Sequence, residues 1–190
     1  TKDMAIEEAK RCLSCDTMCS ICATVCPNRA NIAYPVKPFK APTFKVEQIK
    51  GKITVESDGS FVVSQPYQII NIADCCNECG NCASFCPTSG APYMDKPKFY
   101  LSREDFEKED KGYLIENATI YKRIRGVATK LTKTENTFVY ESDQLIAHID
   151  STNCNVIKSE FKTKDDQRQD ISEAAELVFL YNALNNILLN

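Results

Sequence analysis

The sequence has few of the residues from which hydrolytic and nucleotide-binding sites are built. It contains one histidine, His148, so no Ser–His–Asp or Cys–His pair can be assembled with a histidine to spare. Its six glycines, at positions 51, 59, 80, 90, 112 and 126, do not form the G-x-G-x-x-G motif of dinucleotide and flavin sites. A phosphate-binding P-loop is also absent from these residues. The sequence therefore predicts no catalytic residue in this chain.

An excess of basic residues and long apolar runs are missing as well. The 190 residues include 23 Lys and Arg against 26 Asp and Glu, which gives a net charge of -3 and a pI near 5.3. Without a basic surface, no nucleic-acid partner is expected. No apolar run approaches the ~18 residues that a membrane span needs, so no membrane partner is expected either.

The first residues, Thr1 to Glu8, are charged and amphipathic and lack the pattern of a signal peptide. They are predicted to be helical and are not preceded by a Met, so we expect the chain to be cut from a longer polypeptide. An odd number of cysteines without a secretory signal favours a reducing compartment, and we expect a cytoplasmic location.

Cysteine is the one abundant unusual residue. Ten of the eleven cysteines fall within residues 12–26 and 75–86. Disulfides join distant loops and have little use for cysteines two or three residues apart. Such spacing is typical of thiolates that share one metal ion or cluster.

The second cysteine segment has the bacterial ferredoxin pattern. Its ligand run is Cys76-x2-Cys79-x2-Cys82-x3-Cys86, followed by Pro87. In such a run three thiolates bind one [4Fe–4S] cluster, and the fourth binds the other cluster of a pair. Gly80 permits a close approach of the backbone to the cluster.

The first cysteine segment is a variant of this pattern, with five cysteines before Pro27. Cys19, Cys22 and Cys26 have the standard spacing, but the position of the remaining ligand is occupied by Asp16. Cys15 lies one residue earlier, and Cys12 is a further candidate.

Exchange of the fourth ligands between the segments gives the predicted ligand sets. We call the two sites cluster one and cluster two. Cluster one takes Cys15, Cys19, Cys22 and Cys86, with Cys12 as an alternative ligand. Cluster two takes Cys76, Cys79, Cys82 and Cys26.

Two other interpretations of the cysteines stay open. Paired C-x2-C motifs also bind structural zinc, although zinc motifs rarely carry this run closed by Cys-Pro. A cluster with a purely structural role is the second alternative. Three further side chains are predicted to be ordinary structural or idle groups: Cys75, His148 and Cys154.

The fold class predicted is α+β, with a two-cluster ferredoxin-like core over residues 1–98 that carries a β-hairpin insertion at about 44–72. A Pro-rich connector between Pro35 and Pro42 is predicted to be irregular. The hairpin is predicted to turn at Ser57–Ser60, where Asp-Gly lies between apolar residues. Residues 99–190 are predicted to form a small α+β domain.

Further elements are predicted from apolar periodicity. The expected strands are Tyr67–Ile72, Thr119–Ile124, Thr137–Tyr140, Leu145–Ile149 and Asn155–Lys162. The expected helices cover residues 1–11, a short stretch from Leu101 and the C-terminal residues 171–189, the last opened by a capping box from Asp170 to Glu173.

Residues 7–31 and 76–96 resemble a known family. The first includes Glu-Glu-Ala-Lys-Arg-Cys-Leu-Ser-Cys and Cys-Pro-Asn-Arg-Ala-Asn, and the second Cys-Asn-Glu-Cys-Gly-Asn-Cys and a later Gly-x-Pro-Tyr-x-Asp-Lys. They are similar to the C-terminal iron–sulfur region of the selenate reductase flavoproteins, which are large relatives of the glutamate synthase small chain. The likeness is vague over the C-terminal residues.

This resemblance implies a part of a large cytoplasmic oxidoreductase of anaerobes. Its other domains or subunits would bind FAD or FMN and NAD(P)H, its partners would include molybdenum hydroxylases, and a purine-type substrate is implied. The family also has a five-cysteine first segment. The function expected is electron transfer through two [4Fe–4S] clusters; the alternatives are a free-standing ferredoxin and a metal-stabilised interaction module.

Overall fold

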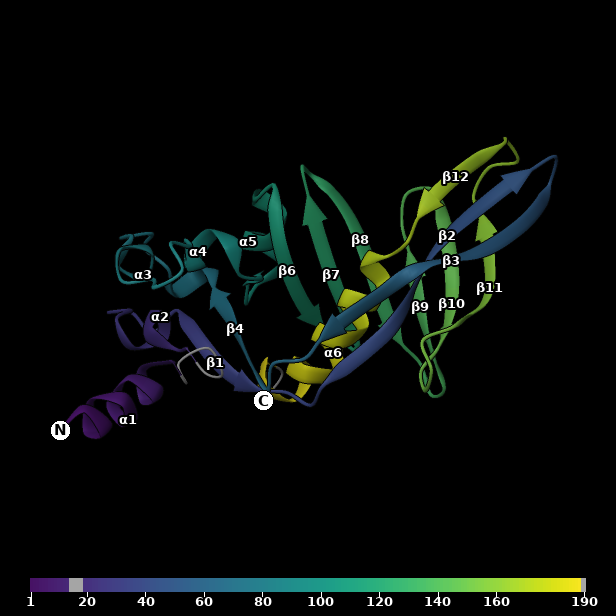
Figure 1. Ribbon diagram of the computed structural model, residues 1–190. Coiled ribbons are helices and arrows are strands. Elements are labelled where there is room, and N and C mark those ends of the chain that lie inside the picture. The colour runs from purple at the N-terminus through teal and green to yellow at the C-terminus, as the bar shows by residue number, and fades with distance from the viewer. Residues whose placement is uncertain (14–18, 189–190) are drawn as a thin grey trace. The chain divides into compact units, whose positions relative to one another are not determined.

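The computed structural model describes residues 1–13 and 19–188, apart from the side chains of residues 8–13 and 186 (Figure 1). The fold is α+β, with strands predominating and a long helix near the C-terminus. The chain forms two compact units. The cysteine unit comprises Thr1–Pro38 and Ser64–Lys98, and the sheet unit comprises Phe39–Val63 and Phe99–Asn190. No helix in the described part of the chain is long and apolar enough to cross a membrane.

The cysteine unit consists of short elements. Its elements are α1 (Lys2–Leu13), α2 (Ile21–Thr24), β1 (Asn31–Pro35), β4 (Tyr67–Ile72), a 3₁₀ helix (Ala73–Cys75), α3 (Asn81–Ser84) and α4 (Pro92–Asp95). β1 and β4 pair antiparallel, and α2 contacts both β1 and α3. β4 buries Ile69, Ile70 and Ile72, because a β-branched strand packs well when it is covered. α1 and β4 confirm the predicted helix and strand.

The sheet unit contains the rest of the regular structure. Its strands are β2 (Phe39–Ile49), β3 (Lys52–Val63), β6 (Lys111–Glu116), β7 (Thr119–Ile124), β8 (Val127–Lys133), β9 (Thr137–Glu141), β10 (Leu145–Asp150), β11 (Val156–Phe161) and β12 (Gln167–Asp170). Its helices are α5 (Arg103–Lys108) and α6 (Glu173–Leu188), and the two-residue β5 (Lys98–Phe99) stands at its boundary. β6 to β11 form an antiparallel meander in chain order, and β12, β2 and β3 form a second sheet.

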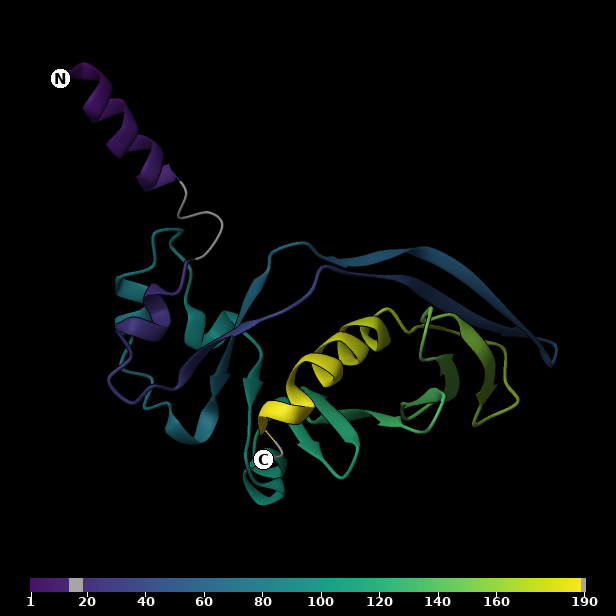
Figure 2. The same cartoon turned by 90° about the horizontal axis from the view of Figure 1, so that it is seen from below.

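Helix α6 is the centre of the sheet unit. The meander lies against it, and the β2–β3 hairpin crosses its opposite side (Figures 1 and 2). Phe179 contacts Phe39 and Phe61 of the hairpin at ring-centroid distances of 5.5 and 6.0 Å. On the meander side Tyr181 meets Phe138 at 5.8 Å. Two sides of α6 are therefore covered, which agrees with its many apolar residues, while Asn182 and Ile187 stay exposed.

One lysine and two tyrosines from the meander bind the two glutamates in the first turn of α6. The Lys122 ammonium lies 2.7 Å from Glu176 and 3.4 Å from Glu173, and its side chain is 10% exposed. Tyr113 donates to Glu176 at 2.6 Å, and Tyr140 donates to Glu173 at 2.7 Å. Burial and these carboxylates raise the pKa of both phenols. The two glutamates thus join the helix to β6, β7 and β9.

The capping box predicted at Asp170–Glu173 is wrong. Asp170 accepts from the backbone N–H of Ser172 at 2.8 Å, and α6 begins only at Glu173. The Glu173 side chain is engaged with Lys122 and Tyr140, so it is not available to cap the helix.

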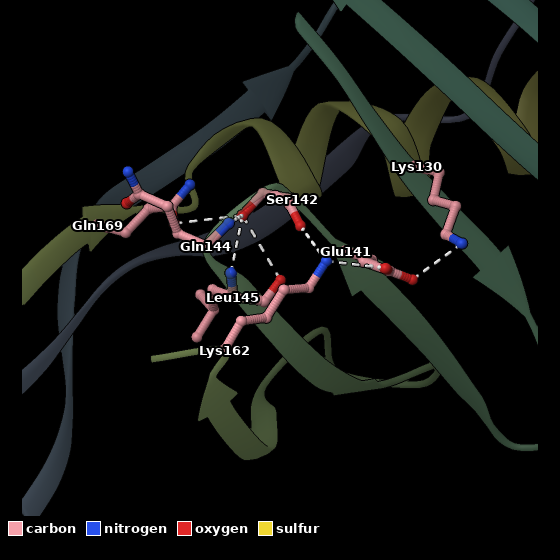
Figure 3. Close-up of polar contacts among 7 residues, drawn as sticks. All are labelled: Lys130, Glu141, Ser142, Gln144, Leu145, Lys162 and Gln169. Atoms are coloured by element: carbon pink, nitrogen blue, oxygen red, sulfur yellow. Dashed lines mark hydrogen bonds and ion pairs between the residues drawn. The ribbon is translucent and has the colours of Figure 1, made fainter. Parts of the chain in front are cut away.

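A second polar cluster joins the ends of four strands (Figure 3). Ser142, after β9, accepts from the backbone N–H groups of Gln144 and Leu145 and contacts Gln169 of β12 at 3.2 Å. Lys162, after β11, donates to Glu141 at 2.9 Å and to the Ser142 carbonyl at 2.7 Å. The buried backbone groups at this corner of the sheet unit therefore have partners.

The β2–β3 hairpin turns at a different place from the one predicted. Its turn is at Lys50 and Gly51, both with positive φ, and β3 runs without a break through Asp58 and Gly59. Asp58 is an extra residue in the ladder, because Thr43 pairs with Gly59 and Phe44 with Ser57. The Asp-Gly pair therefore forms a β-bulge, a second structure that also favours glycine.

The Pro-rich connector is irregular only over residues 36–38, and its two ends lie in strands, contrary to the prediction. Pro35 ends β1, and Pro42 lies within β2. β1 is an edge strand, and β12 pairs with β2 only from Lys45 to Gln48, so Pro42 has a ladder partner on one side alone. Proline is accommodated in strands at such one-sided positions.

The hairpin groups with the C-terminal residues and not with the cysteine segments that flank it in sequence. Gln48 of β2 donates to the carbonyls of Thr163 and Asp165 at 3.0 and 2.9 Å. The sequence analysis had assigned the hairpin to residues 1–98. That assignment rests on proximity in sequence, whereas the half-buried Phe39 and Phe61 of the hairpin pack against Phe179 of α6.

Candidate metal centre

The two cysteine segments fold into equivalent turns, 60 positions apart in the sequence. α2 carries the buried Cys22, and α3 carries the buried Cys82. The backbone N–H of Thr24 donates to the Ser20 carbonyl at 3.1 Å, and that of Ser84 donates to the Gly80 carbonyl at 3.0 Å. The sequence repeat is thus also a repeat of backbone hydrogen bonds.

The equivalence extends to the cysteine that closes each turn. The Ala30 N–H donates to Cys26 Sγ at 3.2 Å, and the Gly90 N–H donates to Cys86 Sγ at 3.3 Å. The residue just before each donor, Arg29 or Ser89, has a positive φ. The left-handed residue bends the chain back, so that a backbone N–H reaches the sulfur.

These donors favour the thiolate, which is the form that binds metal. At Cys26, burial opposes ionisation, but backbone N–H groups of Asn31, Ala30, Asn28 and Arg29 outweigh it and lower the pKa. At Cys86 the Thr88 hydroxyl, the Thr88 N–H and the Gly90 N–H lower the pKa. Burial instead raises the pKa of Cys22. The hydrogen bonds to the two closing cysteines therefore favour their thiolate form.

The four cysteines predicted for cluster two line one cavity within the cysteine unit. They are Cys26, Cys76, Cys79 and Cys82. Cys26 comes from the first segment and the other three from the second, as the exchange of fourth ligands requires. The other wall residues are Asn31, Asn77, Glu78, Gly80, Asn81 and Tyr93.

Gly80 gives this wall its shape. Its φ is +79°, and a Cβ added there would meet no protein atom within 4 Å. The left-handed conformation leaves open space in front of the backbone, which suits the close approach of a sulfide. Four thiols, one open glycine and N–H donors to sulfur fit a [4Fe–4S] cluster.

The same residues fit a single ion less well. Within the described part of the chain, no three His, Cys, Asp or Glu side chains lie close enough together to hold one metal ion. A zinc ion needs four ligands at one point. Cluster ligands bind different corners, so they surround a cavity without meeting.

The residues predicted for cluster one are described in part. Cys19 is exposed, Cys22 is buried against Cys82 and Ile69, and Cys86 is half-buried. Cys15 falls within residues 14–18, which lie outside the described residues. The backbone of Cys12 is described, but its side chain is not. The choice between Cys12 and Cys15 therefore stays a prediction.

The remaining singled-out side chains do not line this cavity. Cys75 ends the 3₁₀ helix and is exposed. His148 and Cys154 belong to the sheet unit: His148 pairs with Val139 in the β9–β10 ladder, and burial raises the pKa of Cys154. Sequence reasoning missed Asn31 as a wall residue, because its position follows from the β1–β4 register and not from cysteine spacing.

Comparisons with known proteins give a limited result. The chain is 34% identical over 119 residues to the protein named "Putative oxidoreductase YgfK" of Escherichia coli strain K12, and equally to that of Escherichia coli O157:H7. The alignment covers 62% of this chain but 9% of each relative. No family model matches the chain. No solved structure matches it. The chain is thus similar to a small part of a large protein that is named an oxidoreductase.

Proposed function

We propose that this chain is an electron-transfer module that holds two [4Fe–4S] clusters and serves a larger NAD(P)H- and flavin-dependent reductase. The observation that carries the proposal is the cavity lined by Cys26, Cys76, Cys79 and Cys82, because it joins cysteines from two distant segments in the predicted set. Cysteine-bound [4Fe–4S] clusters supply a centre that takes up and releases single electrons.

The residues of the chain would perform three tasks at these sites. The thiolates would hold the clusters, and the backbone N–H groups at Cys26 and Cys86 would stabilise their negative charge. The apolar contact of Cys22, Ile69 and Cys82, covered by Tyr93, would keep water out. Hydrogen bonds to sulfur and exclusion of solvent are among the factors that set cluster potentials.

The parent enzyme is proposed from similarity. YgfK is named an oxidoreductase, and the cysteine segments resemble those of selenate reductase flavoproteins. Flavin-containing domains or subunits of the same cytoplasmic enzyme would exchange electrons with the clusters. Molybdenum hydroxylases are proposed as further partners and a purine-type molecule as the substrate. The selenate in the family name has no counterpart among these residues.

The first experiment is analysis of iron and acid-labile sulfide in anaerobically purified protein, with an EPR spectrum after reduction by dithionite. We expect about eight irons and eight sulfides per chain and a coupled signal from two reduced clusters. Zinc in place of iron would overturn the proposal.

Ligand variants make the assignment specific. Cys26→Ser should lower the iron content by about four per chain, since it removes a ligand of cluster two alone. Cys75→Ser is the matched control, because Cys75 is exposed and lies next to the ligand Cys76. It should keep all the iron. Equal loss in both variants would contradict the ligand set.

A further inference from the structure

The two cysteine turns differ in a buried position. Asn31 follows Cys26 by five residues, and the equivalent residue after Cys86 is Ala91. Asn31 is 4% exposed. Ala91 has no polar side chain, and its backbone N–H donates to Asp95 at 2.6 Å. The repeat therefore carries a buried amide in one half only.

Both ends of the Asn31 amide are bound. Its Nδ2 donates to the Cys22 carbonyl at 3.1 Å, and its Oδ1 accepts from Asn71 Nδ2 at 2.9 Å. Asn71 stands directly opposite Asn31 in the β1–β4 ladder. Since a donor and an acceptor are both engaged, the orientation of the amide is fixed.

The buried side chain of Asn71 includes an energetically unfavourable group. It is fully buried, and its Oδ1 has no hydrogen-bond partner. A buried unpaired oxygen is destabilising, and an apolar residue of similar size would avoid the loss. The contact that distinguishes the Asn71 side chain from such a residue is its hydrogen bond to Asn31.

Asn31 contacts both predicted cluster sites. It lines the cavity of Cys26, Cys76, Cys79 and Cys82, and it holds the turn that carries Cys22. In the proposed assignment Cys22 belongs to cluster one and the cavity to cluster two. An amide nitrogen has two N–H groups, and the Cys22 carbonyl takes one of them. The amide therefore has a second N–H in addition to the one bound to Cys22, on a residue that lines the cavity.

We propose that Asn31, held by Asn71, is a positioning residue that links the two cluster sites and raises the reduction potential of cluster two. The inference rests on the proposed function. An amide dipole at the wall of a cavity favours the additional negative charge of the reduced state, as hydrogen-bond donors near a metal site do. The same amide fixes the Cys22 turn, so both sites depend on one side chain.

The test is an EPR-monitored redox titration of anaerobically purified protein. Asn31→Asp keeps the shape and the acceptor for Asn71 but replaces the donor with a negative charge. It should lower the potential of at least one cluster so that the reduced-to-oxidised ratio at fixed potential falls about tenfold, equivalent to ~59 mV for one electron. The iron content should stay at the wild-type level.

The matched control is Gln68→Glu. Gln68 is half-buried in β4, so this variant adds the same charge to the same two-stranded ladder, away from the cavity wall. The reduced-to-oxidised ratio should change less than twofold. Equal shifts in Asn31→Asp and Gln68→Glu would overturn the inference, because charge alone would then explain them.

Asn71→Ala is a second variant, in which no residue of the cavity wall is changed. It should lower the potential in the same direction but less, with iron retained, and it decides the question if Asn31→Asp does not fold. Two clusters with unchanged potentials in both variants would overturn the role of Asn31 and leave the proposed function intact. Wild-type protein without iron would overturn the proposed function itself.

Discussion

The sheet unit and the cysteine unit bury different kinds of side chain. In the sheet unit α6 buries Leu177 and Leu184 completely, among aromatic residues from the strands and the hairpin. In the cysteine unit the buried set includes two cysteines and two asparagines beside the isoleucines of β4. Apolar burial is extensive in the first unit, whereas the second has little of it. We therefore expect the cysteine unit to depend on the group that its thiols bind.

Removal of iron should have the largest effect and should act on one unit only. Bound metal contributes folding free energy directly when the unfolded chain has no formed site. Iron chelation should therefore abolish hydrogen-exchange protection in β1 and β4 while protection in β7 and α6 persists. Loss of protection in both units together would show that the two units do not differ in their dependence on iron. Retention of protection in both would show that the clusters are not needed for folding.

Lys122→Met should destabilise the sheet unit by about 3–5 kcal/mol, because it leaves two partly buried carboxylates without their cation. Denaturant unfolding followed by the tyrosine signal measures this. Lys108→Met is the matched control, since Lys108 is exposed and pairs with Glu104 on the surface. It should leave the unfolding midpoint unchanged. Iron content should be normal in both variants.

Leu177→Ala should cost about 2–5 kcal/mol of unfolding free energy, from lost burial and the cavity left behind. Leu177 is fully buried in α6. Thermal unfolding gives the loss, and iron analysis should again show about eight irons per chain. A parallel loss of iron would mean that the two units are not independent in stability.

The smallest expected change in unfolding free energy comes from replacing either of two comparable glycines with alanine. Gly51 in the hairpin turn has φ +78° and Gly80 has φ +79°, and an added Cβ meets no protein atom within 4 Å at either. Alanine should therefore cost about 1–2 kcal/mol of unfolding free energy at both positions, measured in the iron-loaded protein. In the iron-loaded protein Gly80→Ala should also lower the iron content, since only Gly80 lines the cavity. Equal iron content would show that the cluster does not approach Gly80.

Much of the fold could be predicted from local pattern. β4 and β7 were predicted with the bounds they have, because their apolar residues are dense and β-branched. β12, Gln-Arg-Gln-Asp, has no apolar residue, and it forms a strand because β2 offers it a ladder far away in sequence. β6 and β8 were also missed, since Gly112 and the lysines of β8 weaken their periodicity.

In the candidate site, too, local sequence patterns could be predicted and contacts between distant residues could not. Cysteine spacing predicted that Cys26 joins Cys76, Cys79 and Cys82, because ligand spacing is a local property with a chemical cause. The amide pair Asn31–Asn71 could not be found in this way. The two residues lie 40 positions apart, and only the pairing of β1 with β4 brings them together.

The interruption of the cysteine unit by the β2–β3 hairpin has a consequence for the order of synthesis. Phe39 and Phe61 leave the ribosome more than a hundred residues before Phe179, the aromatic residue that covers them. Long-range pairing of this kind is slow and leaves apolar surface exposed in the meantime. A shortened chain that stops after residue 98 would keep the hairpin without α6. Such a fragment is expected to aggregate through the hairpin even if its clusters form. A version of the fragment in which a short linker replaces residues 39–63 should stay monomeric.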